Sequence, residues 1–255
     1  MFRGIYECVA AMRVQEAAVD VSANNLANAE TSGFSKSLAL AKAAPQAELV
    51  RIDRNPGGGA RRTAVGSAAL SVVLSETAVD VSPGAVRETG NPLDCAIVGD
   101  GYFQVTDSRE TAYTREGRFS IDGQGRIVTP TGLALMGAEG PLAVGGANEI
   151  RIDSDGTVRA DGTIVGRIAV FRFNAPGYLA REGNSRLKST VSSGEPVPVP
   201  PEETRLSAGS VEGSNVSVVE EMARMISANR AYEAASKAFD AGSEAGRGMI
   251  EAFGL

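Results

Sequence analysis

The sequence predicts an α+β protein in which helices at the two ends of the chain flank a central all-β domain. Both ends carry apolar residues at alternating spacings of three and four, and the middle has short alternating runs between glycine-containing turns. With 255 residues and 43% hydrophobic side chains, the chain is long enough to bury a core. We expect an N-terminal assembly helix (1–35), an extended connection (36–78), a β domain with a Pro-rich return (79–206) and a C-terminal assembly helix (207–255).

The first predicted helix spans residues 2–29. Its apolar or small positions are Ile5, Val9, Met12, Val19, Ala23 and Leu26. Glu16 interrupts this spacing, which is otherwise typical of a coiled-coil seam. We expect the helix to end before Thr31-Ser32-Gly33, because glycine after polar residues favours the left-handed turn that closes a helix.

The C-terminal segment repeats this spacing over a longer run. Its positions are Val218, Met222, Met225, Asn229, Tyr232, Ser236, Phe239, Ser243, Gly246, Ile250 and Phe253. Ser217 and Glu220 have the spacing of a capping box, which predicts that the helix begins there. Together the two terminal helices are expected to form a coiled-coil-like assembly region.

Both helical stripes are narrower than the face of a helix that lies on a globular core. The two helices could pair only with each other within one chain. Small or polar residues at Asn229, Ser236, Ser243 and Gly246 weaken that single seam. The pattern therefore favours additional partner helices.

The region from about residue 85 to 175 predicts an all-β unit. Its strand candidates are 96–98, 102–105, 112–114, 118–121, 126–128, 150–152, 157–159 and 167–171. Glycines at 123, 125, 156 and 162 provide the positive φ angles that hairpin turns require. The stretches 36–78, with a glycine run at 55–59, and 188–206, with four prolines, are expected to be extended or mobile connections.

Composition excludes several classes of function. The chain has no histidine, which removes His-containing catalytic triads and His-ligated metal sites. Its 25 basic and 31 acidic residues lack the positive charge of a general nucleic-acid binder. Cys8 and Cys95 lie among apolar neighbours and without a CxxC pattern, so we expect buried thiols rather than a disulfide or metal pair. We expect no metal and no cofactor.

The N-terminal segment does not have the pattern of a secretory signal or a membrane span. Arg3, Glu7 and Arg13 interrupt its apolar residues. We therefore expect no membrane insertion, and either a cytoplasmic protein or one exported without a cleaved signal peptide.

A pair of carboxylates could carry out glycoside hydrolysis without histidine. The candidates in the β region are Asp94, Asp100, Glu110, Glu116 and Asp122. Most lie near glycine or proline, where carboxylates stabilise turns. The glycine run at 57–59 lacks the spacing of a phosphate loop, and Asp153–Gly156 lacks that of a calcium loop. We expect no enzyme, and the alternatives are a cell-wall glycoside hydrolase and a secreted adhesin.

Three motifs together resemble the flagellar axial family, which contains the rod and hook components of the bacterial flagellum. The first is SANNLANAETSGF at 22–34. The second is GAVRETGNPLDCAIVGDGYFQV at 84–105, continued by YTREGRF at 113–119 and DGQG at 122–125. The third is EGSNV at 212–216, which leads into EEM at 220–222 and RAYE at 230–233. The resemblance covers both ends and the β core, and is weak over 36–78 and 175–206.

The resemblance implies a structural subunit of the flagellar basal-body rod, in the periplasm, that transmits torque and does no covalent chemistry. Its terminal helices would pack with those of neighbouring subunits into a tube, with the β domain outside. The implied partners are copies of the chain, other rod subunits and the flagellar export apparatus. The length leaves little room for the outer domains of hook proteins. Segments 137–142 and 150–168 resemble proximal-rod members more closely than distal-rod members.

The expected assembly interface combines the large residues of both stripes with the polar residues of the first motif. It consists of Ile5, Val9, Met12, Val19, Asn24, Asn25, Leu26, Asn28, Phe34, Val218, Met222, Met225, Tyr232, Phe239, Ile250 and Phe253. The asparagines are expected to satisfy backbone groups and to cap the helix where the chain turns away.

Overall fold

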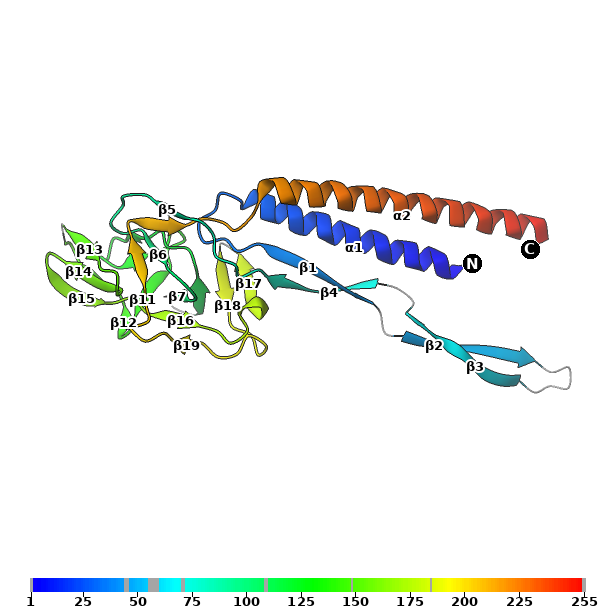
Figure 1. Ribbon diagram of the computed structural model, residues 1–255, viewed down its shortest axis with the longest axis horizontal. Coiled ribbons are helices and arrows are strands. Elements are labelled where there is room, and N and C mark those ends of the chain that lie inside the picture. The colour runs from blue at the N-terminus through cyan, green and yellow to red at the C-terminus, as the bar shows by residue number, and fades with distance from the viewer. Residues whose placement is uncertain are drawn as a thin grey trace. The chain divides into compact units, whose positions relative to one another are not determined.

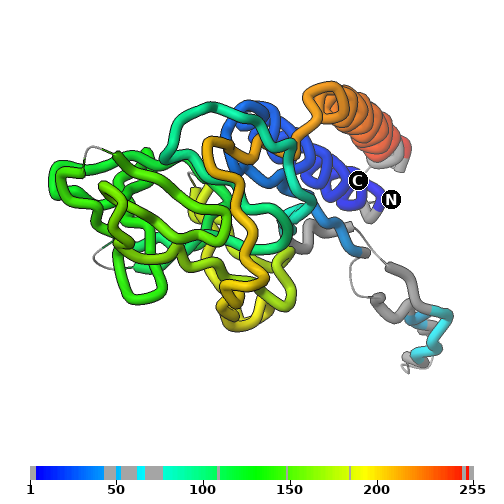
Figure 2. Tube along the Cα trace, turned by 60° about the vertical axis from the view of Figure 1, so that its left-hand side comes forward, coloured from blue at the N-terminus to red at the C-terminus, as the bar shows by residue number. Residues whose placement is uncertain are grey.

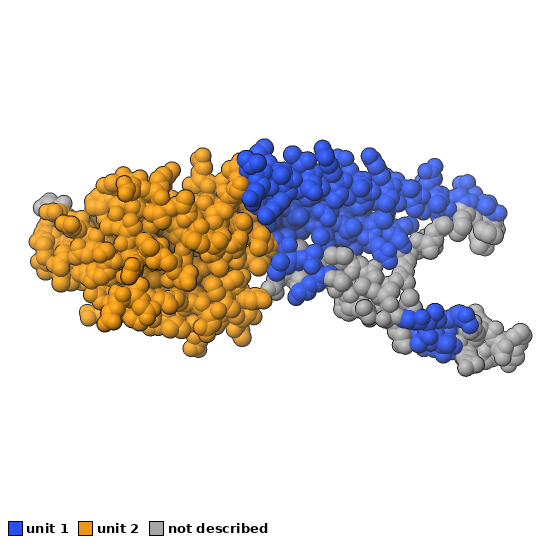
Figure 3. All heavy atoms as spheres, viewed as in Figure 1, with its two compact units in different colours: residues 1–24, 39–77, 219–255 blue, residues 25–38, 78–218 orange. Residues whose placement is uncertain are grey.

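The computed structural model describes residues 2–43, 46–54, 60–69, 72–107, 110–147, 149–183 and 185–253. The glycine run expected at 55–59 lies outside these residues. The chain forms two compact units (Figure 3). Unit 1 contains residues 1–24, 39–77 and 219–255, and unit 2 contains 25–38 and 78–218. The four segment boundaries expected from the sequence stay a prediction.

The terminal helices form as expected, which confirms the α+β class. They are α1 (Phe2–Ala27) and α2 (Val218–Phe253). Figures 1 and 2 show them side by side, with the two ends of the chain at the same end of the pair. An added Cβ on Gly242 of α2 would lie 3.8 Å from Cγ1 of Ile5 of α1, so the helices approach closely there.

α1 ends before Thr31 and α2 begins after Ser217, as expected, but the contacts at these ends differ from those expected. α1 ends at Ala27, where the N–H groups of Asn28 and Ala29 donate to carbonyls three residues earlier. Gly33 has a φ of 65° but lies beyond this turn, so it does not close the helix. α2 begins directly after Ser217, although within the described chain Ser217 makes no capping hydrogen bond.

The least exposed face of α2 differs from the expected one in the first half of the helix and agrees with it in the second. The buried or half-buried positions are Glu221, Met225, Ala228, Ala235, Ser236, Phe239, Gly242, Ser243 and Gly246. Five of them, Met225, Ser236, Phe239, Ser243 and Gly246, belong to the predicted stripe, whereas Val218 and Met222 of that stripe are 44% and 50% exposed. The intrachain seam uses small residues that let two helix backbones approach, which leaves larger apolar residues on the surface.

The segment expected to be only an extended connection contains paired strands. These are β1 (Ser37–Ala43), β2 (Gln46–Arg54), β3 (Ala60–Ala69) and β4 (Val72–Val79). β2 pairs antiparallel with β3 from Gln46 opposite Ala69 to Arg54 opposite Ala60, and β1 pairs with β4. The backbone is extended as expected, but its hydrogen bonds are made within the chain.

Unit 2 is built from short strands. They are β5 (Val86–Glu88), β6 (Cys95–Ile97), β7 (Tyr102–Thr106), β8 (Thr111–Thr114), β9 (Ser120–Ile121), β10 (Ile127–Val128), β11 (Ala134–Gly137), β12 (Gly140–Pro141), β13 (Ile150–Ile152), β14 (Thr157–Ala160), β15 (Thr163–Arg167), β16 (Val170–Arg172), β17 (Ala180–Gly183), β18 (Arg186–Lys188), β19 (Val197–Pro198), β20 (Leu206–Ala208) and β21 (Ser210–Glu212). A 3-10 turn (Pro176–Tyr178) precedes β17.

The largest sheet has the order β17-β18-β8-β7-β11-β10-β9, with β12 on β11, β16 on β7 and β19 on β16. A second sheet has the order β13-β14-β15, and the pairs β20-β6 and β21-β5 bring the end of unit 2 back to its beginning. Every register given for these pairs is antiparallel. Gly125, Gly156 and Gly162 have positive φ, as their predicted turns require, whereas Gly123 does not.

Most strand predictions were correct, and one was wrong. The predicted strand at 167–171 is divided, because Arg167 ends β15 while β16 begins at Val170. Ile168 instead bridges to Gly137. The alternation of apolar residues continues across this corner, which is why the sequence showed a single run.

Two hydrophobic clusters cover the two faces of β7. Phe103 and Val105 belong to the larger cluster, and Tyr102 belongs to the smaller one with Tyr113 and Phe173. Adjacent side chains of a strand point to opposite faces, so one short strand serves both clusters. The rings of Phe103 and Phe119 pack edge to face, with their centroids 5.3 Å apart.

Candidate assembly interface

The three motifs of the sequence meet at one place in unit 2, which we call the motif junction. It consists of residues 25–37, 80–84, 115–116 and 212–215. The N–H of Gly33 donates to the carbonyl of Glu212 at 2.8 Å, and the N–H of Asn215 donates to the carbonyl of Phe34 at 3.3 Å. Segments from both ends of the chain are therefore hydrogen-bonded to one another.

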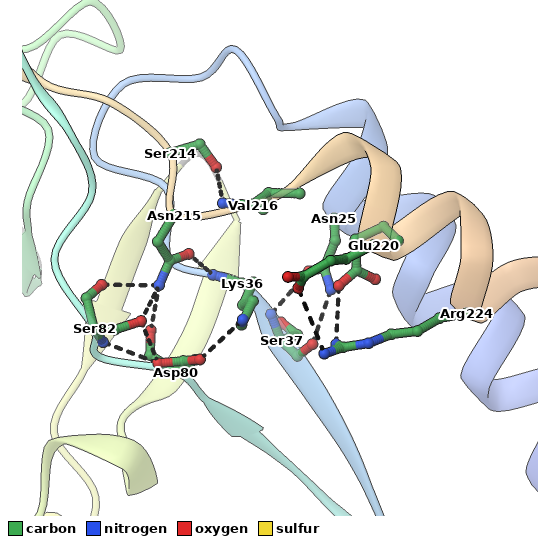
Figure 4. Close-up of polar contacts among 11 residues, drawn as sticks. Asn25, Lys36, Ser37, Asp80, Ser82, Ser214, Asn215, Val216, Glu220 and Arg224 are labelled. Carbon is green, nitrogen blue, oxygen red and sulfur yellow. Dashed lines mark hydrogen bonds and ion pairs between the residues drawn. The ribbon is translucent and has the colours of Figure 1, made fainter.

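Asn215 joins three chain segments through its side-chain amide (Figure 4). Its Oδ1 accepts from the N–H of Lys36 at 2.7 Å. Its Nδ2 donates to the carbonyls of Asp80 and Ser82 at 3.0 and 2.9 Å. Both ends of the amide are used, so substitution by an apolar residue would leave backbone groups of two segments without partners.

Asn25 pairs with the backbone of Ser37 in the same manner as a neighbouring strand does. Its Oδ1 accepts from the N–H of Ser37 at 2.8 Å, and its Nδ2 donates to the Ser37 carbonyl at 2.9 Å (Figure 4). The side chain of Asn25 is fully buried. Asn28 lies in the turn, where its Oδ1 accepts from the Thr31 hydroxyl at 3.3 Å. Asn25 thus satisfies both backbone groups of Ser37, and the capping role expected of the three asparagines stays a prediction.

Gly33 allows the close approach on which this junction depends. A Cβ at this position would lie 2.2 Å from the backbone N of Glu116 and 2.4 Å from the carbonyl carbon of Arg115. Its φ of 65° is also unfavourable for other residues. The next residue, Phe34, is buried with the Arg181 guanidinium 4.3 Å above its ring.

A buried ion pair links the second motif to the third. Nη1 of Arg115 lies 3.0 Å from Oε2 of Glu212, and both side chains are less than a tenth exposed. Nη2 of Arg115 also donates to the Gly99 carbonyl, and Oε1 of Glu212 accepts from the N–H of Gly84. Buried charges are tolerated when they are paired and hydrogen-bonded, as here.

Lys36 and Asp80 form a second, partly exposed ion pair in the junction. Their Nζ and Oδ2 atoms are 3.2 Å apart. Partial burial by itself would raise the pKa of Asp80, but hydrogen bonds from Ser82 and the ammonium of Lys36 outweigh it and hold that pKa below its ordinary value. The carboxylate form of Asp80 is therefore favoured by the fold.

The predicted interface residues fall into four groups. Asn24, Val218, Met222 and Tyr232 are exposed. Ile5, Val9, Met12, Val19, Leu26, Asn28, Met225 and Phe239 are half-buried, and Asn25 and Phe34 are buried. The side chains of Ile250 and Phe253 lie outside the described ones. Asn25, Asn28 and Phe34 thus lie in the motif junction. The predicted apolar residues other than Phe34 lie on α1 and α2.

Further exposed apolar residues lie on α2 where the sequence analysis did not place them. Val219 and Ile226 are 78% and 54% exposed, beside Val218 and Met222. We call these four residues the outer helix face. The spacing of four between residues 218, 222 and 226 was a signal for this face, but the longer alternating stripe obscured it.

Two of the carboxylates considered for hydrolysis, Asp94 and Asp122, are engaged in structural contacts. Asp94 is buried and accepts hydrogen bonds from the side chains of Thr89 and Asn91 at 2.7 and 2.9 Å. Asp122 accepts from the Arg126 guanidinium at 2.7 Å within its turn. These contacts stabilise turns, as the neighbouring glycines predict.

The cysteines and acidic residues give no metal site in the described part of the chain. No group of three or more potential ligands occurs there. Cys8 and Cys95 are both free thiols, but only Cys95 is buried as expected, and Cys8 is half-buried. Burial raises the pKa of Cys95 to about 12. Within the described residues, neither helix combines the length and apolar character needed to cross a bilayer.

Comparison with known proteins places the similarity on the same three regions. A family model described as "Flagella basal body rod protein" matches residues 5–34. The model "Flagellar hook protein FlgE/F/G D1 domain" matches residues 96–160, and "Flagellar basal body rod FlgEFG protein C-terminal" matches residues 207–245.

Individual relatives match along almost the whole chain. Flagellar basal-body rod protein FlgF of Caulobacter vibrioides is 30% identical, over 92% of this chain and 91% of the relative. FlgG of Bacillus subtilis is 31% identical over 93% of this chain and 94% of the relative. FlgF of Escherichia coli is 33% identical over 84% of this chain and 83% of the relative.

Proposed function

The chain belongs to the flagellar basal-body rod protein FlgE/F/G family and is a structural, non-enzymatic subunit of the rod; on that basis we propose that it assembles through the exposed faces of α1 and α2. The outer helix face carries this proposal. Complete burial of an exposed apolar side chain contributes about 1.5–3 kcal/mol, so covering the exposed part of each of these would contribute about 1–2 kcal/mol. When a surface patch of one subunit binds a different patch of the next subunit, the same contact can repeat along a tube.

We propose that the chain occupies the proximal part of the rod, as FlgF-type subunits do, rather than the distal part. Segments 137–142 and 150–168, which form the β11-β12 turn and the sheet from β13 to β15, support this assignment through their resemblance to proximal-rod members. The alternative is a distal-rod role like that of FlgG. Cryo-electron microscopy of isolated basal bodies would show which position the chain takes.

Its proposed partners are copies of itself, other rod subunits and the flagellar export apparatus. The free thiols are compatible with passage of an unfolded chain, because no disulfide has to be opened.

Substitution on the outer helix face tests the proposal. Met222 is half exposed, so Met222→Asp removes apolar contact with a neighbour without emptying the seam within the chain. We expect loss of rod incorporation and of motility, with export retained, because an aspartate would be buried in an apolar contact. Met222→Leu is the matched control and should swim normally. Normal incorporation of Met222→Asp would contradict assembly through this face.

Met225→Asp is expected to have the same effect on motility. Since Met225 is half-buried within the chain, this variant also disturbs the pairing of α1 and α2. Circular dichroism of the purified variant would separate the two causes.

A further inference from the structure

An uncharged turn of unit 2 presents an apolar side chain at its tip. Val191 is fully exposed, and among the large apolar residues that the structure describes it is the most exposed. The residues on either side of it bond to each other. The N–H of Thr190 donates to Oγ of Ser193 at 2.8 Å, and the N–H of Ser193 donates to Oγ1 of Thr190 at 3.0 Å. We call residues 190–193 the valine turn.

Contacts with the rest of unit 2 fix the conformation of the valine turn. The N–H of Ala175 donates to the carbonyl of Ser193 at 3.2 Å, and the Thr190 hydroxyl donates to the carbonyl of Tyr178 at 2.8 Å. In the described chain, by contrast, the N–H and C=O of Val191 make no hydrogen bond. The turn therefore offers a partner one apolar side chain and one free peptide unit in a fixed conformation, which lowers the entropic cost of binding.

A groove elsewhere on unit 2 is lined mainly by apolar residues. It has a volume of about 670 Å³. Gln104 of β7, Met136 of β11 and Phe171 of β16 contribute to its lining. These three side chains are half-buried, so the groove is open to a partner. No residue of the valine turn lines it.

One polar side chain in this lining has no partner. The side-chain amide of Gln104 makes no hydrogen bond within the described residues. An amide has both donors and an acceptor, so it can bond the N–H and the C=O of a peptide. Asn25 already bonds the backbone of Ser37 in this manner. The groove therefore fits an apolar side chain that arrives with an unpaired peptide unit.

The wall of the groove disfavours an added strand. Residues 198, 200 and 201 of this wall are prolines, which have no N–H to donate to a neighbouring strand. Two charged residues also line the groove. Arg167 is paired with Asp155 at 3.1 Å, and Glu139 is exposed. An uncharged turn thus matches the groove better than a strand or a charged segment does.

We propose that the valine turn of one copy of this chain inserts into the groove of a second copy, with Val191 against Met136 and Phe171 and its peptide unit bonded to Gln104. This inference rests on the proposed function and adds a contact between units 2 of neighbouring copies. Turn and groove share no residue, so each copy can use both at once, and the contact can repeat without closing on a dimer. The tip of a turn buries far less than the roughly 1,200 Å² of a stable interface, so we expect the contact in the assembly and not between free chains.

A charge placed on each side tests the contact. Val191→Asp and Gln104→Lys should each lower the amount of chain in purified basal bodies about tenfold or more, because each places an unpaired charge in an apolar contact. The chain with both changes pairs the two charges between copies and should return to within about threefold of the wild type.

Two variants serve as matched controls. Val191→Ile keeps an apolar tip and should be incorporated normally. Val98→Asp adds the same charge at a 53% exposed valine of unit 2 outside the turn and the groove, and should also be incorporated normally. Circular dichroism melts of the purified variants check that each of them folds.

The outcomes separate this contact from the proposed function. Normal incorporation of Val191→Asp, with Met222→Asp excluded, would overturn the turn contact while leaving assembly through the helices in place. A double variant as poorly incorporated as the two single variants would also overturn it, because position 191 would then not lie beside Gln104 of another copy. Normal incorporation of Met222→Asp would contradict the proposed function itself.

A photochemical cross-link gives a readout that depends neither on motility nor on the folding of Gln104→Lys. A benzophenone amino acid in place of Val191 bonds, on irradiation, to C–H groups in contact with it. Assembled protein from a mixture of ¹⁴N- and ¹⁵N-labelled chains should yield mixed-isotope peptides that join position 191 to segment 136–140 or 198–201, and dilute free chains should not. Cross-links only to other segments, or only to a different protein, would overturn the proposal.

Discussion

Gly33→Ala should strongly destabilise unit 2, for two reasons that the structure separates. A residue with a side chain pays about 1–2 kcal/mol to hold the positive φ that Gly33 adopts. Its Cβ would also lie 2.2 Å from the backbone N and 2.5 Å from Cα of Glu116. Because these are backbone atoms, they cannot move aside by a change of rotamer, and such overpacking costs about 1–3 kcal/mol.

The expected total is a loss of about 2–5 kcal/mol in the free energy of unfolding. The effect should spread through the junction, because the Gly33 N–H donates to the Glu212 carbonyl and the Glu212 carboxylate is paired with Arg115. Urea denaturation of the full chain, followed by circular dichroism, measures this loss.

Gly132→Ala is the matched control for the backbone contribution. Gly132 has a φ of 84°, and an added Cβ would have no atom within 4 Å. This variant should lose only the about 1–2 kcal/mol of the positive φ. If Gly33→Ala is no more destabilising than Gly132→Ala, the close approach of Gly33 to Glu116 is not what requires the glycine.

Three further predictions follow from the junction, the core and the helices. Asp80→Asn should lower the free energy of unfolding most at pH values above the ordinary carboxyl pKa of 3.8. The difference in this free energy from wild type should vanish as the pH falls through the lowered pKa of Asp80. Urea denaturation across pH measures it, with Asp100→Asn, at an exposed position, as the control. Cys95, which is fully buried and has a pKa of about 12, should resist iodoacetamide at pH 8 until the protein is unfolded, and labelling of native protein at Cys95 would contradict this. Limited proteolysis of the dilute monomer should trim both terminal segments before residues 85–175, because exposed helix faces lack their partners; equal resistance of ends and β region would refute this.

Local patterns were sufficient for the classes of element and for much of their placement. The strand pairs around Tyr102–Thr106 and Thr157–Ala160 follow from alternating apolar residues between glycine turns, which act over a few neighbouring residues. The break between β15 and β16 at Ile168 could not be predicted in this way. The apolar residues continue to alternate through that corner, so its sequence looks the same as that of one straight strand.

The junction was recognisable as a set of motifs but not as a contact. Asn25 bonds a backbone 12 residues away, whereas Asn215 bonds segments 133–179 residues away. The same amide could have capped a helix or formed a local turn, since asparagine does each of these readily. Only the folded chain shows which backbone groups lacked other partners.

The sequence by itself determined that this protein has two terminal helices, a β unit between them and no histidine-based chemistry, because period, turn residues and composition are local properties. Tertiary structure decided which side of α2 is used within the chain. In the first half of α2 the covered face runs through Glu221, Met225 and Ala228, whereas the predicted stripe runs through Met222, Met225 and Asn229. Both contain Met225, so the heptad spacing alone allows either. The small residues permit close contact with α1, and this choice leaves Met222 and Ile226 on the surface.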